Sequence, residues 1–452
     1  MTQALSSSVN AKNRFWAAFG GPIGLWSTLT RGGAELSWVL AGKFALMGAN
    51  AAVMLFLAKR LDLRTYGLLV ITISGQLLVS RLLMMGVDVG MVRLTALEEL
   101  RPRAQEVITG GVVVMACTSA LLIVLAVLAI PALSVIPGWV VACIVIGSIG
   151  MAFVDYGYSF RLARQQYPLA MLAQGGTAVL RLVITVGVTV SLAVHPDVVF
   201  LGYHGTTLLS GVIQILVIAG ASWRRPDTPL IKRLLRYSFW QGKANVIVIF
   251  SLYQGTFLLM LLKDPAATGL FGLALTVSLG FFAIYNAYFE YLMARMRSVE
   301  HAFPRFLTHS LLAALLLMVA CVPVIFALVK LLPWFLGAEW QGVVAVFVYL
   351  GAAMVLLIFQ APLEAACHYL LKPQLISFGW LARVVLIAIF GFILAPRMGA
   401  TGAALAQLLG FAIGLLLLSY LVLARLRSAT PKARNMTARG KREASSLVNV
   451  DE

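Results

Sequence analysis

Long apolar runs alternate with short polar segments along most of the chain. Each run approaches the roughly 20 residues that an α-helix needs to cross a hydrocarbon layer about 30 Å thick. The pattern therefore predicts an all-α polytopic membrane protein with about twelve transmembrane helices. The predicted spans are Leu36–Ala58, Tyr66–Asp88, Val107–Ile130, Trp139–Tyr156, Leu172–Ala193, Val199–Ala221, Phe239–Leu262, Gly269–Leu292, Leu307–Leu332, Gln341–Gln360, Ile376–Leu394 and Ala400–Ala424.

Three segments are too polar to cross a membrane. Residues 1–35 show no cleavable signal peptide, and their aromatic and basic residues suit either an interfacial helix or an unstructured leader. Residues 425–452 form a basic tail that is expected to be disordered and cytoplasmic. Residues 222–236 follow the sixth span and are expected to be a cytoplasmic hinge between an N-lobe, 36–221, and a C-lobe, 237–424.

The two lobes show a weak internal similarity. The segments Lys59–Leu69 and Lys263–Ala274 each run from a lysine through a short turn to a helix that starts with an aromatic residue, glycine and leucine. Because each lobe holds an even number of spans, the repeats are expected to be parallel and related by an axis along the membrane normal. The pattern therefore favours two six-helix bundles.

Composition and charge agree with this topology. Hydrophobic residues make up 61% of the chain and charged residues 12%, whereas soluble domains carry about 25% charged residues. The net charge of +18 is unevenly placed: of the 35 Lys and Arg, 24 lie in the termini and in the loops on their side, and six lie in the opposite loops. Basic residues concentrate on the cytoplasmic side of membrane proteins, so both termini are expected in the cytoplasm and a nucleic-acid partner is not expected.

The sequence offers little for catalysis. No long loop could form a folded catalytic domain, and the acidic or histidine clusters of membrane glycosyltransferases and polymerases are missing, so an enzyme is not expected. The five histidines lack metal-ligand spacing, and neither a metal nor another cofactor is expected. The four cysteines, without a C-x-x-C pair, predict no disulfide framework.

Five basic residues lie inside predicted spans, where each costs about 2.5–3.5 kcal/mol on insertion scales. They are Lys43, Arg81, Arg181, Lys243 and Arg383. All five fall in the cytoplasmic half of their spans. Each could snorkel to the interface, but their similar depth, partly matched between the lobes, favours a shared basic cavity.

Acidic residues are expected to leave this cavity positive. Asp88, Asp155, Glu290 and Glu364 lie at or just beyond the cytoplasmic ends of predicted spans. Asp88 is seven residues after Arg81, about 10 Å along a continuous helix, so a direct pair would be strained. A net-positive cavity favours an anionic ligand, and arginine in particular fits phosphate oxygens with two parallel hydrogen bonds.

In-span amides continue these faces. Asn50 shares a helical face with the lysine of span one, and Gln254 with the lysine of span seven. Such amides either hold helices together or bind sugar hydroxyls. The motif Gly410-x-x-x-Gly414 predicts close helix packing.

Several motifs resemble the polysaccharide transporters of the multidrug/oligosaccharidyl-lipid/polysaccharide flippase superfamily. They are Leu57–Leu61, Tyr66–Gly67, Met85–Arg93 and the Gly-x-x-Gly-Ala-Ala segment within Met398–Ala404. The resemblance implies two six-helix bundles around a central cavity and alternating access. It also implies transport of undecaprenyl-pyrophosphate-linked oligosaccharide repeat units to the outer leaflet of the bacterial inner membrane, whose anionic pyrophosphate would suit the basic residues.

The resemblance further implies membrane lipids, a polysaccharide polymerase and glycosyltransferases as partners. Two relatives in the superfamily remain alternatives. Peptidoglycan-precursor flippases usually have two further helices, which the basic tail cannot supply. Multidrug exporters often use acidic in-span residues, which the predicted spans lack. We therefore expect Lys43, Arg81, Lys243 and Arg383 to bind the headgroup, with Arg181, Asn50 and Gln254 beside them.

Overall fold

Helices form almost all of the chain in the computed structural model, which describes residues 45–95, 98–129, 137–164, 166–191, 195–220, 223–296, 303–370 and 374–448. No strand occurs within these ranges. The helices are Ala45–Ala58, α3 (Leu63–Met84), α4 (Val87–Thr95), η1 (Glu98–Arg103), α5 (Ala104–Ala129), α6 (Gly138–Ala163), α7 (Tyr167–Ser191), α8 (Pro196–Gly220), α9 (Thr228–Leu261), α10 (Pro265–Met296), α11 (Phe303–Leu336), η4 (Ala338–Trp340), α12 (Gly342–Tyr369) and α13 (Gln374–Val448).

The helices account for the predicted spans. Among the described residues, ten helices are long and apolar enough to cross a membrane, and Ala45–Ala58 is the described part of the first predicted span. Within α13, Gly399 has φ 56° and ψ −134°, which kinks the helix between the eleventh and twelfth predicted spans. Glycine adopts this backbone conformation without a steric penalty. The prediction of an all-α, multi-pass membrane protein is confirmed.

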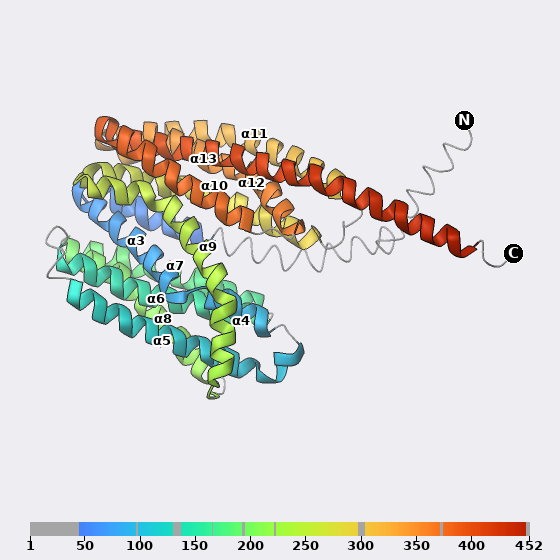
Figure 1. The fold of residues 1–452 in the computed structure, drawn as a ribbon. Coiled ribbons are helices and arrows are strands. Elements are labelled where there is room, and N and C mark those ends of the chain that lie inside the picture. Colours follow the sequence, from blue (N-terminus) through green and yellow to red (C-terminus); the bar gives the residue numbers. More distant parts are fainter. Residues whose placement is uncertain are drawn as a thin grey trace.

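The helices form two bundles (Figure 1). Helices α3–α8 form the N-bundle, helices α10–α13 form the C-bundle, and α9 crosses from one to the other. The first turns of α9 belong with the N-bundle, because Leu230 and Leu234 are buried in the same apolar cluster as Met84 and Val107. Further along α9, Leu252 and Leu259 join the apolar cluster that includes the C-bundle.

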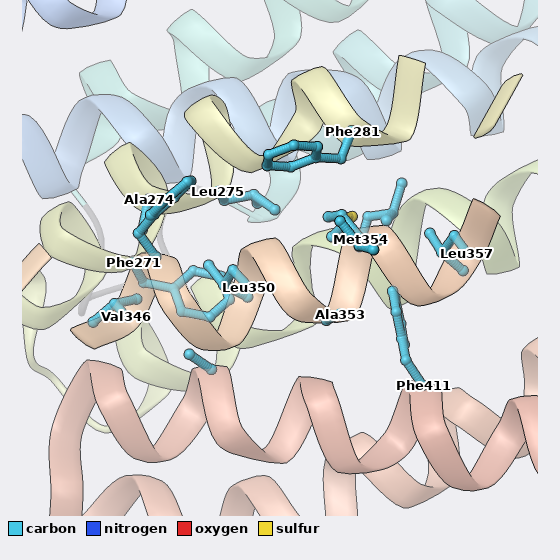
Figure 2. Close-up of a cluster of buried hydrophobic side chains, with 14 of the residues drawn as sticks. Phe271, Ala274, Leu275, Phe281, Val346, Leu350, Ala353, Met354, Leu357 and Phe411 are labelled. Carbon is cyan, nitrogen blue, oxygen red and sulfur yellow. The ribbon is translucent and has the colours of Figure 1, made fainter. Parts of the chain in front are cut away.

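The apolar centre of the C-bundle lies between α10 and α12 (Figure 2). Phe271 and Leu275 of α10 meet Leu350 and Met354 of α12, while Phe411 reaches α12 from α13. Because lipid tails are as apolar as these side chains, the contact is stabilised by close van der Waals packing and not by transfer from water. Helices α10 and α12 therefore pack closely together, and α10 also contacts α9 and α3.

The predicted hinge is partly helical. Its residues from Thr228 onward form the start of α9. The Asp227 carboxylate accepts a hydrogen bond from the Leu230 amide at 2.9 Å, an N-cap that fixes where the helix begins. The basic tail also differs from expectation, since α13 continues to Val448.

Two helices extend past the apolar windows that predicted them. Helix α6 continues beyond Tyr156, and α12 continues beyond Gln360. As a result, Asp155 and Glu364 lie inside helices and are buried, with 4% and 3% of their surface exposed. The expectation that these acids sit at span ends was wrong, because polar residues packed in the interior do not end a helix.

The second predicted span is broken. Helix α3 ends at Met84 and α4 begins at Val87, with Met85 at φ 47° and Gly86 at φ 75°. Gly86 lies against α9 so closely that a Cβ there would come within 2.5 Å of the Gly242 nitrogen. Only a glycine leaves room for this contact while its φ is positive.

Candidate functional site

A cavity of about 120 Å³ lies between the two bundles. One wall comes from Ala45–Ala58 and the N-bundle, and the other from α9 and α10. Its polar or aromatic lining residues are Asn50, Ser74, Gln76, Arg181, Tyr203, Tyr253 and Thr276. The apolar remainder includes Met54, Val70, Leu275 and Leu279. Two of the residues predicted as site residues, Asn50 and Arg181, therefore meet in one cavity.

Arg181 is the charged residue of this lining. It lies on the buried face of α7, in register with Ala178 and Thr185, and only 5% of its surface is exposed. Spacings of three and four residues place these side chains on one helical face. The α-helical register thus directs a permanently charged side chain into the interior, and the short residues beside it leave space for the guanidinium.

Neutral groups hold the Arg181 guanidinium in place. Nη1 donates to the Asn50 side-chain oxygen at 3.1 Å and to the Tyr203 hydroxyl at 3.2 Å, and Nη2 donates to the Thr207 hydroxyl at 2.9 Å. The guanidinium carbon also lies 4.6 Å from the centre of the Tyr203 ring, which adds a cation–π attraction. These contacts orient the charge without cancelling it.

No carboxylate of the described residues forms an ion pair with Arg181. Its Nε also has no hydrogen-bond partner within that part of the chain. A buried charge is stable only when it is paired or well solvated by dipoles. The cavity wall is therefore positive at Arg181 and suits an anion that brings its own oxygen acceptors.

Arg81 is in a different situation from the one expected. It forms an ion pair with Asp155 at 3.0 Å and approaches Asp88 at 4.0 Å, while Gln174 donates to the Asp155 carboxylate at 3.1 Å. The expectation that a direct Arg81–Asp88 pair would be strained assumed a continuous helix, which the break at Met85–Gly86 interrupts. The charge of Arg81 is balanced in this arrangement.

Arg383 is sealed inside the C-bundle. None of its surface is exposed, and the guanidinium carbon lies 4.6 Å from the Trp380 ring centre and 5.3 Å from that of Phe411. A Cβ on Gly414 would lie 2.4 Å from the Arg383 Cγ. The motif Gly410-x-x-x-Gly414 thus provides the close packing that was predicted. It packs against the part of α13 before the Gly399 kink, which carries Arg383.

Glu364 on α12 is a buried acid of the C-bundle. Its carboxylate accepts hydrogen bonds from the Tyr285 hydroxyl, the Gln360 amide and the Trp380 indole. No ion pair joins Arg383 to it in the described residues. Arg383 is therefore held by aromatic faces and by the field of a hydrogen-bonded carboxylate, and it does not line the cavity.

The other predicted site residues are dispersed. Lys43 lies outside the described residues. Lys243 is exposed near the middle of α9, and Gln254 donates to the Val384 carbonyl at 3.0 Å inside the C-bundle. The structure brings Arg181 and Asn50 together and places the other described basic residues in separate surroundings, so they do not form one continuous ring.

The polar face of α8 was not predicted from the sequence. Tyr203, His204, Thr207, Ser210 and Gln214 are all buried on this helix. Their spacing of three and four residues within an apolar span is the signal that could have identified them. Two of them bind Arg181, and His204 adjoins it through Tyr203.

Comparison with known proteins gives a fold. No protein-family model matches the chain, and no curated protein matches it. An inward-facing multidrug resistance MATE family transporter of the MOP superfamily has a TM-score of 0.64 at 16% identity, over 85% of this chain and 95% of that one. The lipid II flippase MurJ, in an inward closed conformation, has a TM-score of 0.66 at 13% identity, over 85% and 87%.

A third similar structure is described as a MOP superfamily transporter from Pyrococcus furiosus in which the binding pocket has reverse polarity. Its TM-score is 0.54 at 14% identity, over 87% of this chain and 96% of that one. All three cover most of both chains, and their identities are too low to transfer a substrate. The chain has the fold of the MOP superfamily transporters.

Proposed function

We propose that this protein is a flippase that moves polyprenyl-pyrophosphate-linked oligosaccharide repeat units from the inner to the outer leaflet of the bacterial inner membrane. The two bundles alternate between states open to either side, and the lipid tail stays in the bilayer while the headgroup crosses. The translocated units would serve surface polysaccharide assembly together with glycosyltransferases and a polymerase.

The observation that carries this proposal is the uncompensated Arg181 in the cavity between the bundles. A pyrophosphate offers oxygens to a guanidinium held in a fixed orientation. Asn50, Gln76 and Thr276 also line the cavity and offer amide and hydroxyl groups to the saccharide. A cationic drug would meet repulsion from Arg181, so the charge disfavours a multidrug exporter.

The cavity of about 120 Å³ is small beside the roughly 300–1,000 Å³ of ordinary ligand sites. A lipid-linked oligosaccharide therefore requires the bundles to separate. In this proposal Lys43 and Lys243 attract the headgroup as it enters from the cytoplasm. Arg81 and Arg383 contact the substrate only after their present partners rearrange, and Gln254 moves with Arg383 because it is bonded to the adjacent residue.

A peptidoglycan precursor is the second candidate, favoured by the structural similarity to the lipid II flippase MurJ. Both candidates use a lipid-linked pyrophosphate. Deletion of the gene separates them, because loss of a sole peptidoglycan-precursor flippase is lethal, while loss of a polysaccharide flippase leaves cells viable without surface polysaccharide.

The test compares Arg181→Ala and Arg181→Lys in a deletion strain. We expect Arg181→Ala to abolish surface polysaccharide and to raise lipid-linked intermediates in the inner leaflet, while Arg181→Lys retains part of the export because the charge remains. Arg305→Ala, an exposed position outside the cavity, is the matched control. Wild-type polysaccharide from a normally expressed Arg181→Ala variant would refute the proposal.

A further inference from the structure

A histidine lies buried directly behind the cavity wall. His204 follows Tyr203 on α8 and has none of its surface exposed. Its Nδ1 lies 2.6 Å from the Gln76 side-chain oxygen, and its Nε2 lies 3.0 Å from the Thr72 hydroxyl. Gly147 closes the site from α6, because a Cβ there would lie 2.5 Å from Nδ1. The imidazole is therefore fixed between two side chains of α3.

The hydrogen-bond directions place a hydrogen on Nε2 of His204 but do not decide whether Nδ1 also carries one. The Thr72 hydroxyl donates its own hydrogen to the Leu69 carbonyl at 2.7 Å, so toward His204 it acts as an acceptor. Nε2 must then carry a hydrogen. Nδ1 accepts a hydrogen bond if the imidazole is neutral and donates one if the imidazole is positively charged.

The protonation of Nδ1 also affects the cavity, because the Gln76 side chain that faces Nδ1 lines the cavity as well. Opposite a neutral His204, the amide NH₂ of Gln76 must turn toward Nδ1 and its oxygen faces the cavity. Opposite a charged His204, the oxygen accepts from Nδ1 and the NH₂ faces the cavity. The two orientations of an amide occupy the same volume, so one proton changes the cavity wall from acceptor to donor.

The groups around His204 link this proton to the anion site. Helix α3 contributes the neutral Thr72 and Gln76, and α6 contributes Gly147. On α8, the Tyr203 ring centre lies 5.1 Å from that of His204, and its hydroxyl accepts from Arg181 of α7. The described residues place no ion-paired carboxylate on His204. Arg181 is the charged group facing it and opposes a second positive charge.

We propose that His204 is a proton-binding site coupled to anion binding at Arg181, so that a proton accompanies the phosphate-containing substrate. This inference rests on the proposed function. A bound anion cancels the field of Arg181, a proton then binds Nδ1 of His204, and the Gln76 NH₂ turns to donate to the anion. Because coupling between two sites is reciprocal, protonated His204 must also tighten anion binding.

The first measurement reads the proton directly. The full-length protein in nanodiscs carries ring-¹⁵N histidine, and the His204 signals are identified by their absence in His204→Gln. At pH 6.5 we expect the imidazolium fraction of His204 to increase when pyrophosphate is added, and to increase in Arg181→Gln without any ligand. His309, exposed on α11, should respond to neither change. An unaltered His204 signal in both cases would overturn the proposal.

The second measurement compares pyrophosphate affinities of wild type and His204→Gln at pH 6 and pH 8. The comparison at one pH cancels the protonation of pyrophosphate itself. At pH 6 we expect wild type to bind pyrophosphate at least about 5-fold more tightly than the variant, within the usual range of coupling. At pH 8 we expect the two affinities to be nearly equal. His309→Gln should match wild type at both values.

The outcomes separate the two proposals. Arg181-dependent pyrophosphate binding with equal affinities in wild type and His204→Gln at pH 6 would overturn the proton site and leave the flippase proposal standing. Absence of pyrophosphate binding would count against the flippase proposal, and the ligand-free Arg181→Gln spectra would still decide whether His204 takes up a proton when the cation is removed.

Discussion

Three in-span arginines have three different environments. Arg181 binds neutral oxygens beside a cavity, Arg81 forms an ion pair with Asp155, and Arg383 lies between two aromatic rings. An arginine side chain is energetically costly inside a membrane, and at these three positions it is stabilised in three separate ways. The charge at each position, and with it the consequence of removing the arginine, depends on its neighbours.

For the Arg81–Asp155 pair, we expect loss of one partner to be more harmful than loss of both. Asp155 is almost fully buried, so Arg81→Ala leaves a carboxylate without its cation, which costs about 3–5 kcal/mol when a pair is fully buried and less here because Arg81 is partly exposed. Thermal unfolding in detergent should show a lower Tm for Arg81→Ala than for the double variant Arg81→Gln/Asp155→Asn. Equal Tm values would contradict this expectation.

For Arg383, we expect the opposite sign. Its three guanidinium nitrogens have no hydrogen-bond partner among the described residues. A buried charge without hydrogen bonds is costly, and a flexible apolar side chain that fills the same space removes this cost. Arg383→Met should therefore keep or raise the Tm of the purified protein. A clear fall in Tm, with Arg305→Met unchanged as the exposed control, would contradict this view of the C-bundle.

At the scale of elements, the bundles meet where glycines remove side chains. Gly86 of the α3–α4 turn and Gly242 of α9 approach backbone to backbone, and Gly67 of α3 lies equally close to Pro265 of α10. These contacts let α3 lie against both α9 and α10.

Substituting Gly242 tests this contact. A Cβ at Gly242 would lie 2.4 Å from the Met85 carbonyl carbon, so Gly242→Val must displace α9 from the α3–α4 turn. We expect a lower Tm and reduced polysaccharide export. Gly205→Val is the control, because nothing lies within 4 Å of a Cβ there. If both variants behave alike, the close approach does not hold the bundles together.

The connection between α8 and α9 is attached to the N-bundle by charge. Arg103 of η1 donates to Asp227 at 2.6 Å and to Glu106, and its guanidinium holds the pKa of Asp227 below the ordinary value. A depressed carboxyl pKa stabilises the folded state above the unfolded pKa of about 3.9, and this stabilisation is lost as the pH falls through the folded value. Between pH 5 and pH 3 the Tm should therefore fall less in Asp227→Asn than in wild type, and parallel Tm profiles would contradict this.

At the scale of the whole molecule, the spans set a topology that reporter fusions can test. The distribution of Lys and Arg predicts cytoplasmic termini, and the turn between α11 and η4 at Gly337 then lies outside. Fusions after Ala221 and near Ala438 should report cytoplasm, and fusions near Pro196 and Gly337 should report the periplasm. A periplasmic signal at Ala438 would reverse the proposed direction of transport.

The sequence by itself determined the all-α, multi-pass architecture and the order of the apolar helices, because apolar length and helical rise leave few alternatives in a bilayer. It also predicted Arg181 and Asn50 as site residues, since a charge or amide within an apolar run is conspicuous. The prediction of these two residues required only helical periodicity and the energetic cost of burying polar groups.

Only the tertiary structure decided which polar groups meet. Asn50 and Arg181 are 131 positions apart, and Arg81 meets Asp155 because α6 extends beyond its apolar window and α3 breaks before Gly86. The polar face of α8 was legible in sequence, yet its pairing with Gln76 and Thr72 of α3 was not. Periodicity fixes the face of one helix, whereas contacts between faces depend on the packing of several helices at once.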